Sequence, residues 1–169
     1  MSSIVTACLG ILFGIVLTDS LQDHHWWPYL RLRSDSLRGD ELSHGVMQRA
    51  LAHYKAGSEA PPYFISVILL VSTTLMGVLV RGIISDKINR PKHFLSFLIF
   101  LGGTGIPFIT KIVPAEEWMH KNGASGLPSE VAQKLHETAF WHMVVGITTL
   151  LNIALQCCFG SRGDKRKLD

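Results

Sequence analysis

The side chains able to do acid–base or metal chemistry in this sequence lie near the ends of apolar stretches. His142 lies about one turn inside such a stretch, and it could pair with Glu137 or His136 for general acid–base work. A lone histidine there is more typical of hydrogen-bonded packing, which is the interpretation we favour. His24 and His25 could contact a metal, but adjacent side chains point apart along most backbones and no third ligand is spaced to join them.

Sequence motifs of enzymes and transporters are missing. The sequence has no CxxC, no HExxH, no Gly-rich phosphate loop and no GxSxG. No Asp, Glu, Lys or Arg lies in the interior of an apolar stretch, whereas Asp19, Arg81 and Lys111 lie at the ends and can reach the interface. We therefore expect a protein with no catalytic activity, no cofactor and no metal. A lipid-modifying enzyme working through His142 and Glu137 is the least favoured alternative.

The placement of the charges indicates a membrane protein. The chain of 169 residues carries 16 Lys and Arg and 13 Asp and Glu, yet four windows carry none. These windows are residues 1–18, 60–80, 93–110 and 138–161. About 20 apolar residues of helix cross a bilayer, and backbone groups in lipid must bond internally, so each window predicts a transmembrane helix. The predicted spans are about 4–18, 62–83, 93–110 and 138–159.

The charges between the spans predict a direction for the chain. The 81–92 connection and the 161–169 tail are both rich in Lys and Arg, whereas the loops 19–59 and 111–137 have slightly more acidic than basic residues. Dense positive segments stay in the cytosol, so both termini are predicted to be cytosolic. The fold class is an all-α membrane protein: one four-helix bundle over residues 1–160 and a short basic cytosolic tail.

The net charge of +3 is too small to indicate a nucleic-acid partner.

The first window could instead be a cleaved signal peptide. Only Met1, Ser2 and Ser3 precede its apolar run, so a basic n-region is missing. No clear A-x-A cleavage site precedes Asp19 either. We therefore expect the first span to be retained.

The two long loops carry further helical patterns. After an irregular segment 19–40, an amphipathic helix is predicted from Ser43 to Gly57, with its apolar face formed by Val46, Met47, Ala50, Leu51 and Tyr54. This helix is interpreted as a lid over the bundle or as a surface for a partner. In the second loop, residues 114–119 could form one helical turn. Pro128 is predicted to begin a helix that continues into the fourth span.

Small residues recur along the spans. Gly10 and Gly14 form a GxxxG pair, and Thr73 and Gly77 repeat the small-xxx-small spacing. Such residues let helix backbones approach in lipid, either inside this bundle or against a partner's helix. Pro107 is predicted to kink the third span, with Thr104 or a neighbouring side chain satisfying the freed carbonyl.

The C-terminal end of the chain carries two further signals. Cys157 and Cys158 lie at the predicted cytosolic end of the fourth span, where they are either palmitoylated or simply small apolar residues. Lys165 and Lys167 fit the dilysine pattern KxKxx, which the retrieval coat reads on cytosolic tails of endoplasmic-reticulum membrane proteins. The same residues are explained by a positive-inside stop after the last span.

The order of these parts resembles the small fungal endoplasmic-reticulum packaging chaperones for amino-acid permeases. The resemblance covers about residues 4–159 and rests on "CLGILFGIVLTDS", on "ALAHYKAGSEAPP" after a Trp-bearing loop, and on "TTLMGVLV". It implies four spans with cytosolic termini, and assistance to the folding and export of multispan permeases. Members of that family tend to have a longer hydrophilic tail associated with the export coat. The tail of about nine residues here puts direct contact with vesicle-coat subunits in doubt.

These observations lead to one hypothesis and one alternative from another class. The hypothesis is an endoplasmic-reticulum membrane chaperone that holds helices of client proteins through weak contacts between small and hydroxyl residues. The candidate contact residues are Gly10, Gly14, Ser72, Thr73, Thr74, Gly77, Met47 and Tyr54. The alternative is a non-catalytic accessory subunit of a stable membrane complex. Membrane lipid is an expected partner in both cases.

Overall fold

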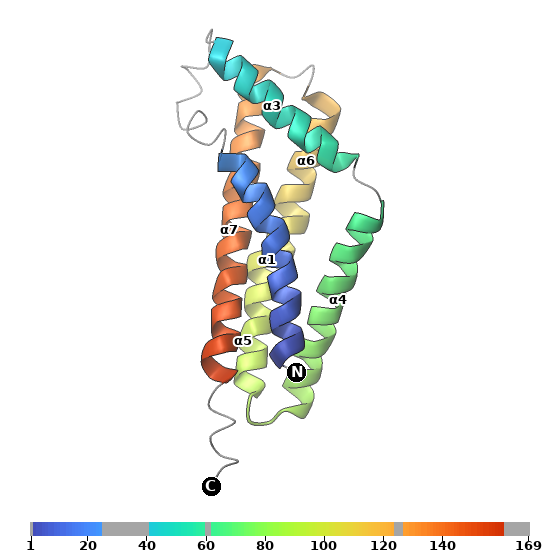
Figure 1. Cartoon of the computed structure of the whole chain (residues 1–169), viewed down its shortest axis with the longest axis vertical. Coiled ribbons are helices and arrows are strands. Elements are labelled where there is room, and N and C mark those ends of the chain that lie inside the picture. The colour runs from blue at the N-terminus through green and yellow to red at the C-terminus, as the bar shows by residue number, and fades with distance from the viewer. Residues whose placement is uncertain (1, 25–40, 60–61, 124–126, 161–169) are drawn as a thin grey trace.

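The protein is described by a computed structural model over residues 2–24, 41–59, 62–123 and 127–160. Every element within these ranges is a helix, and no strand occurs in them (Figure 1). Among the described residues, four helices are long and apolar enough to cross a membrane. They cover Ser3–Leu21, Ile65–Ser85, Arg90–Asn122 and Ser129–Cys158. The prediction of an all-helical, multi-pass membrane protein is thereby confirmed.

Helix α1 (Ser2–His24) packs on α4 (Pro62–Ser85) and α7 (Pro128–Gly160) through one face. Its buried side chains follow the i, i+3, i+4, i+7 spacing of a single helical stripe. They are Val5, Cys8, Leu9 and Leu12, and they join Leu75 and Leu79 of α4 and Phe100 in one apolar core.

The last turn of α1 differs from the sequence prediction. The chain was predicted to be irregular from Asp19, but it stays helical to His24. A charge ends an apolar window without ending the i→i−4 hydrogen bonds, and neither Pro nor Gly interrupts this turn. Asp19 and Asp23 therefore lie one turn apart on a rigid helix. Residues 25–40 lie outside the described residues.

A tight connection joins α4 to α5 (Arg90–Phe100). The carboxylate of Asp86 accepts a hydrogen bond from the backbone N–H of Asn89 at 3.0 Å and another from its side-chain amide at 2.9 Å. These two bonds lower the pKa of Asp86. Gly82 lies against the ring of His93, so the two helices approach closely at this end.

The third long helix is continuous through Pro107. It consists of α5, the π-helical segments η1 (Leu101–Gly105) and η2 (Phe108–Ile112), and α6 (Val113–Asn122). Proline has no N–H for the carbonyl four residues earlier, which belongs to Gly103. Thr148 Oγ1 of α7 donates to that oxygen at 2.8 Å. The prediction that Thr104 or a neighbour satisfies it is corrected: the hydroxyl comes from another helix. Residues 114–119 are part of α6 rather than an isolated turn.

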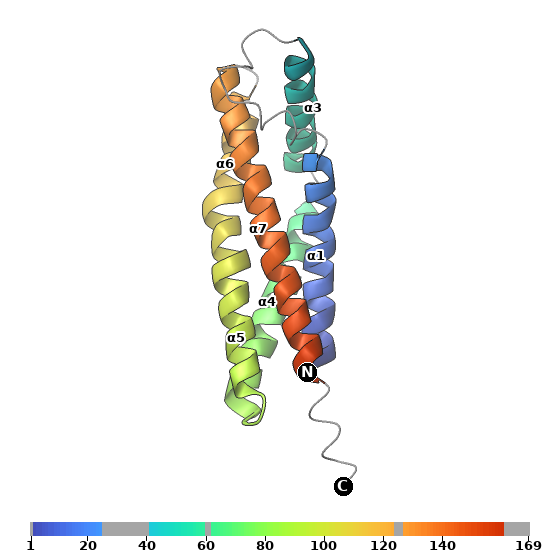
Figure 2. The same ribbon diagram turned by 90° about the vertical axis from the view of Figure 1, so that its left-hand side faces the viewer.

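Helix α3 (Glu41–Ser58) lies across the end of the molecule where α6 and the beginning of α7 meet (Figures 1 and 2). Its apolar face is buried against these two helices. The core formed there consists of Val46, Ala50, Tyr54, Met119, Val131 and Leu135. The predicted apolar stripe of α3 is thus mostly occupied inside the molecule, as a lid would require.

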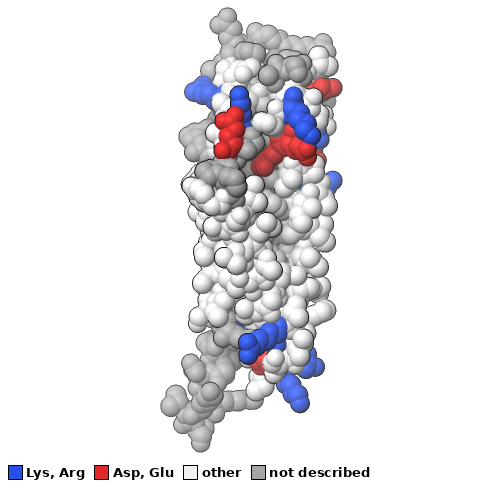
Figure 3. Space-filling view, turned by 90° about the vertical axis from the view of Figure 1, so that its right-hand side faces the viewer, with Lys and Arg blue, Asp and Glu red and all other residues white. Residues whose placement is uncertain are grey.

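The charged residues gather at the two ends of the molecule. Figure 3 shows Lys, Arg, Asp and Glu near both ends of one face, with a broad uncharged band between them. Arg81, Lys87 and Arg90 are exposed at the end opposite α3. An apolar band between charged ends is the surface expected of a protein that crosses a bilayer.

Candidate functional site

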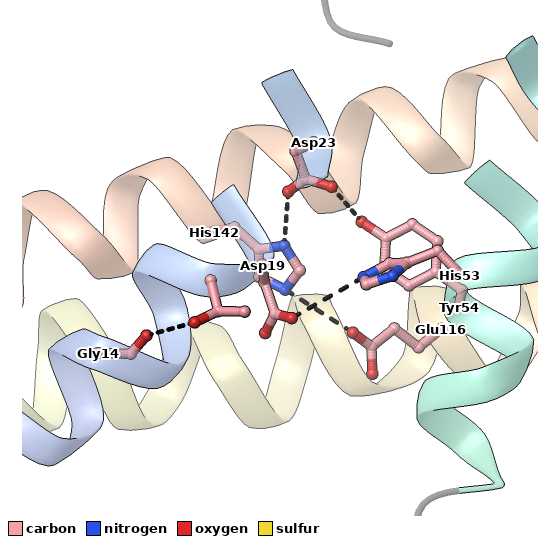
Figure 4. Close-up of polar contacts among 8 residues, drawn as sticks. Gly14, Asp19, Asp23, His53, Tyr54, Glu116 and His142 are labelled. Atoms are coloured by element: carbon pink, nitrogen blue, oxygen red, sulfur yellow. Dashed lines mark hydrogen bonds and ion pairs between the residues drawn. The ribbon is translucent and has the colours of Figure 1, made fainter. Parts of the chain in front are cut away.

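A buried cluster of polar side chains lies where α1, α3, α6 and α7 meet. Asp23 of α1 is only 3% exposed. Its Oδ2 lies 2.8 Å from Nδ1 of His142 on α7, and its Oδ1 accepts a hydrogen bond from the hydroxyl of Tyr54 on α3 at 2.7 Å (Figure 4). One carboxylate therefore joins three helices that are far apart in the sequence.

Two further carboxylates surround this centre. Nε2 of His142 lies 3.7 Å from Oε1 of Glu116 on α6, and Nε2 of His53 on α3 lies 3.9 Å from Oδ1 of Asp19 (Figure 4). The rings of Tyr54 and His142 stack with their centroids 6.3 Å apart. Burial raises the pKa of Tyr54, so its hydroxyl stays protonated and remains a donor.

The cluster has the form of an internal support. A histidine held by a carboxylate is also the arrangement found in general bases. Here, however, both oxygens of Asp23 already have partners, and the second ring nitrogen of His142 faces Glu116. The cluster therefore ties α3 to α1 and α7 through bonds within the chain.

The predicted partners of His142 are wrong. Glu137 instead accepts from Nζ of Lys134 at 3.0 Å, and His136 is exposed. At about 100° per residue, positions five and six residues before His142 point about 140° and 120° away from it around the helix. The sequence did not predict Asp23 as a partner of His142, because Asp23 lies beyond the predicted end of the first span. Extending the predicted helix by one turn would have placed Asp23 one helical turn after Asp19.

An apolar groove adjoins the cluster between α1 and α7. Its volume is about 340 Å³. Its walls are mostly apolar, and its polar lining is Ser20 and Asp23. Both carboxylate oxygens of Asp23 are already bonded to Tyr54 and His142.

A second buried polar cluster ties α5 to α7 nearer the other end. Asn152 Nδ2 donates to the backbone oxygen of Ser96 at 3.0 Å, and Ser96 Oγ donates to Asn152 Oδ1 at 2.5 Å. Gln156 Nε2 donates to Ser96 Oγ at 2.9 Å. Sequence reasoning missed these three residues because it searched the spans for charges, whereas uncharged amides give the same interhelical bonding.

The small residues predicted to make contacts face outward. Gly10 and Gly14 are exposed on α1, and Gly77 is exposed on α4; among the described residues, a Cβ added to any of them would meet no atom within 4 Å. Packing inside this bundle, which was one of two interpretations of the GxxxG pair, is therefore wrong for Gly10 and Gly14. Thr73 and Thr74 are also exposed, and Ser72 is half-buried.

The other predicted contact residues are placed differently. Tyr54 is 7% exposed and belongs to the buried cluster, and Met47 is half-buried beside the α3 core. Tyr54 therefore presents almost no surface to a partner, and Met47 presents only part of its side chain. Lys165 and Lys167 lie outside the described residues. Within the described part of the chain, no three potential ligands gather in a way that could hold a metal.

Compared with protein-family models, with curated proteins and with solved structures, the chain matches none of them.

Proposed function

We propose that this protein is a non-catalytic membrane chaperone that assists the folding and export of multispan membrane proteins, such as amino-acid permeases, from the endoplasmic reticulum. In this proposal the four spans form one bundle over residues 1–160, and α3 lies in the first non-cytosolic loop. The observation that carries the proposal is the outward position of small residues on two spans.

In lipid, helices associate through close packing because the hydrophobic effect does not drive them together. A glycine on an exposed face lets a second backbone approach that face. Gly10 and Gly14 lie one turn apart on the face of α1 opposite its buried stripe, and no described residue of this chain covers them. These positions favour a function in which the helix of another protein is held against the spans.

Helix α4 offers the larger free surface. Only 17% of its span is buried, against 28% to 33% for the other three. Its face around Thr73 and Gly77 points away from the core residues Leu75 and Leu79. Interhelical hydrogen bonds in membranes measure about 0.6 kcal/mol on average, so such contacts hold a client weakly and release it when its native packing forms.

The proposed location is the endoplasmic-reticulum membrane, with both termini in the cytosol. The exposed basic residues at the end opposite α3 support this orientation through the positive-inside rule. Lys165 and Lys167 would then lie on the cytosolic side, where a retrieval coat reads the dilysine pattern. Setting the topology of the last span remains the alternative role of these lysines.

We expect substitution of Gly10, Gly14 and Gly77 by leucine to weaken client binding. The added side chains block the close approach of a second backbone, and each loss of about 0.6 kcal/mol lowers association about threefold. The measurement is the amount of newly made permease that is isolated with the protein after a short radioactive pulse. The matched control is Ile11→Leu, an exposed apolar position on the same helix. Equal recovery with the glycine variants and the control would contradict the proposal.

The accessory-subunit alternative predicts a different outcome of the same isolation. A stable subunit is recovered in gentle detergent with one partner at a fixed ratio, whether that partner is old or newly made. A chaperone is recovered mainly with newly made clients, and each copy of the chaperone is accompanied by less than one copy of a client. Normal delivery of permeases to the cell surface in cells lacking this chain would also count against the chaperone proposal.

A further inference from the structure

The end of α7 opposite α3 presents two adjacent cysteines. Cys157 and Cys158 are both free and exposed, whereas Cys8 is free but only 7% exposed. Gln156 points inward and is 1% exposed. The next two positions are rotated by about 100° and 200° from it, and thus face the lipid side of the helix.

The contacts of α7 with α5 give the depth of these thiols. Gln156 and Asn152 both bond to Ser96, so the two antiparallel helices are in register there. The last turn of α7 is therefore level with the first turn of α5, which begins at Arg90 (Figures 1 and 2). This is the basic end of the molecule, where the uncharged band stops, so the thiols lie close to the end of the last candidate span. In a bilayer, that level corresponds to the boundary between lipid chains and headgroups.

We propose that Cys157 and Cys158 are S-acylated by long-chain fatty acyl groups. The donor is a long-chain acyl-coenzyme A, whose chain lies in the lipid and whose thioester lies at the boundary depth of the two thiols. The basic residues Arg162, Lys165, Arg166 and Lys167 follow within ten residues and attract the phosphates of coenzyme A and of anionic lipids. Cysteines next to a membrane span are the usual sites of reversible S-palmitoylation.

The reaction is a thioester exchange. The thiolate sulfur of the cysteine attacks the carbonyl carbon of the acyl-coenzyme A and forms a new C–S bond. The C–S bond to coenzyme A breaks, and coenzyme A leaves as a thiol with the proton that the cysteine lost. No oxidant or reductant is needed, and each acyl chain adds apolar anchorage to the end of the last span.

The experiment counts thioesters on the full-length protein in membranes. Free thiols are blocked, hydroxylamine cleaves thioesters, and each newly freed thiol is tagged with a maleimide-polyethylene glycol that slows migration on a gel. We expect up to two added tags on the wild type, one on Cys157→Ala or Cys158→Ala, and none on the double variant. Cys8→Ala is the matched control and should behave as the wild type does.

Three results would overturn the proposal. They are a wild type without hydroxylamine-dependent tags, tags that persist in the double variant, and tags that appear with a reductant instead, which would indicate a disulfide. The inference rests on the proposed cytosolic side of the tail. That orientation is tested separately by adding an Asn-x-Ser/Thr sequon to the tail, because the chain has none of its own. A glycosylated tail would refute the orientation, whereas an unglycosylated tail without thioesters would refute S-acylation alone.

Discussion

Replacing His142 with alanine is expected to lower the free energy of unfolding by about 3–5 kcal/mol. His142 and Asp23 are joined at 2.8 Å and are almost fully buried, with side-chain exposures of 4% and 5%. Removing the imidazole leaves a buried carboxylate whose second oxygen has lost its partner, which is far costlier than losing a surface ion pair. The measurement is the unfolding of the purified protein in mild detergent, followed as denaturant is added.

The matched control for this variant is His136→Ala. His136 is on the same helix but is exposed, so its replacement should change stability by no more than about 0.5 kcal/mol. Similar results for the two variants would show that the buried pair adds little to stability. A His142→Ala protein that keeps its stability but no longer promotes permease export would point instead to a chemical role, contrary to the non-catalytic proposal.

Tyr54→Phe probes the third member of the cluster. It removes the donor to Asp23 without changing the size of the ring, and we expect a loss of about 1–3 kcal/mol. Because α3 is tied to α1 through this bond, the variant should also open the lid helix. Faster hydrogen exchange of the α3 amides than in the wild type would reveal that opening, and unchanged exchange would contradict it.

The four spans could be predicted from the sequence because the bilayer sets both their length and their lack of charge. Their ends could not be predicted in the same way. Asp19 ends the apolar window, yet α1 continues to His24, since backbone hydrogen bonding does not depend on apolar side chains. That single turn carries Asp23. Because the predicted span ended before it, the sequence did not predict the buried cluster.

The sequence also did not predict which face of each span is buried and which is exposed. In a soluble helix, polar residues mark the wet side, but both sides of α1 are apolar. Leu9 is buried and Gly10 is exposed, and no contrast in polarity separates them. The pairing of Ser96 with Asn152 spans 56 residues, and Asp23 pairs with His142 across 119. Such partners are set by the packing of whole helices.

Gly103→Ala is expected to destabilise the protein by about 1–3 kcal/mol through overpacking. An added Cβ would lie 2.7 Å from both Cβ and Cγ2 of Thr148, so η1 and α7 would have to separate. The separation would also break the hydroxyl bond to the carbonyl that Pro107 leaves without a donor. The matched control is Gly102→Ala, where a Cβ meets nothing within 4 Å; alanine there should be neutral or slightly stabilising.

The cause of the Gly103→Ala effect is tested by adding Thr148→Gly. Glycine at 148 removes the three atoms nearest to the new Cβ, so the double variant should be more stable than the sum of the two single losses implies. A coupling of at least about 0.5 kcal/mol in detergent unfolding would identify the crowding of these two helices as the cause. Additive losses would mean that alanine acts elsewhere, and that the close approach of η1 to α7 at Gly103 does not support the packing of these helices.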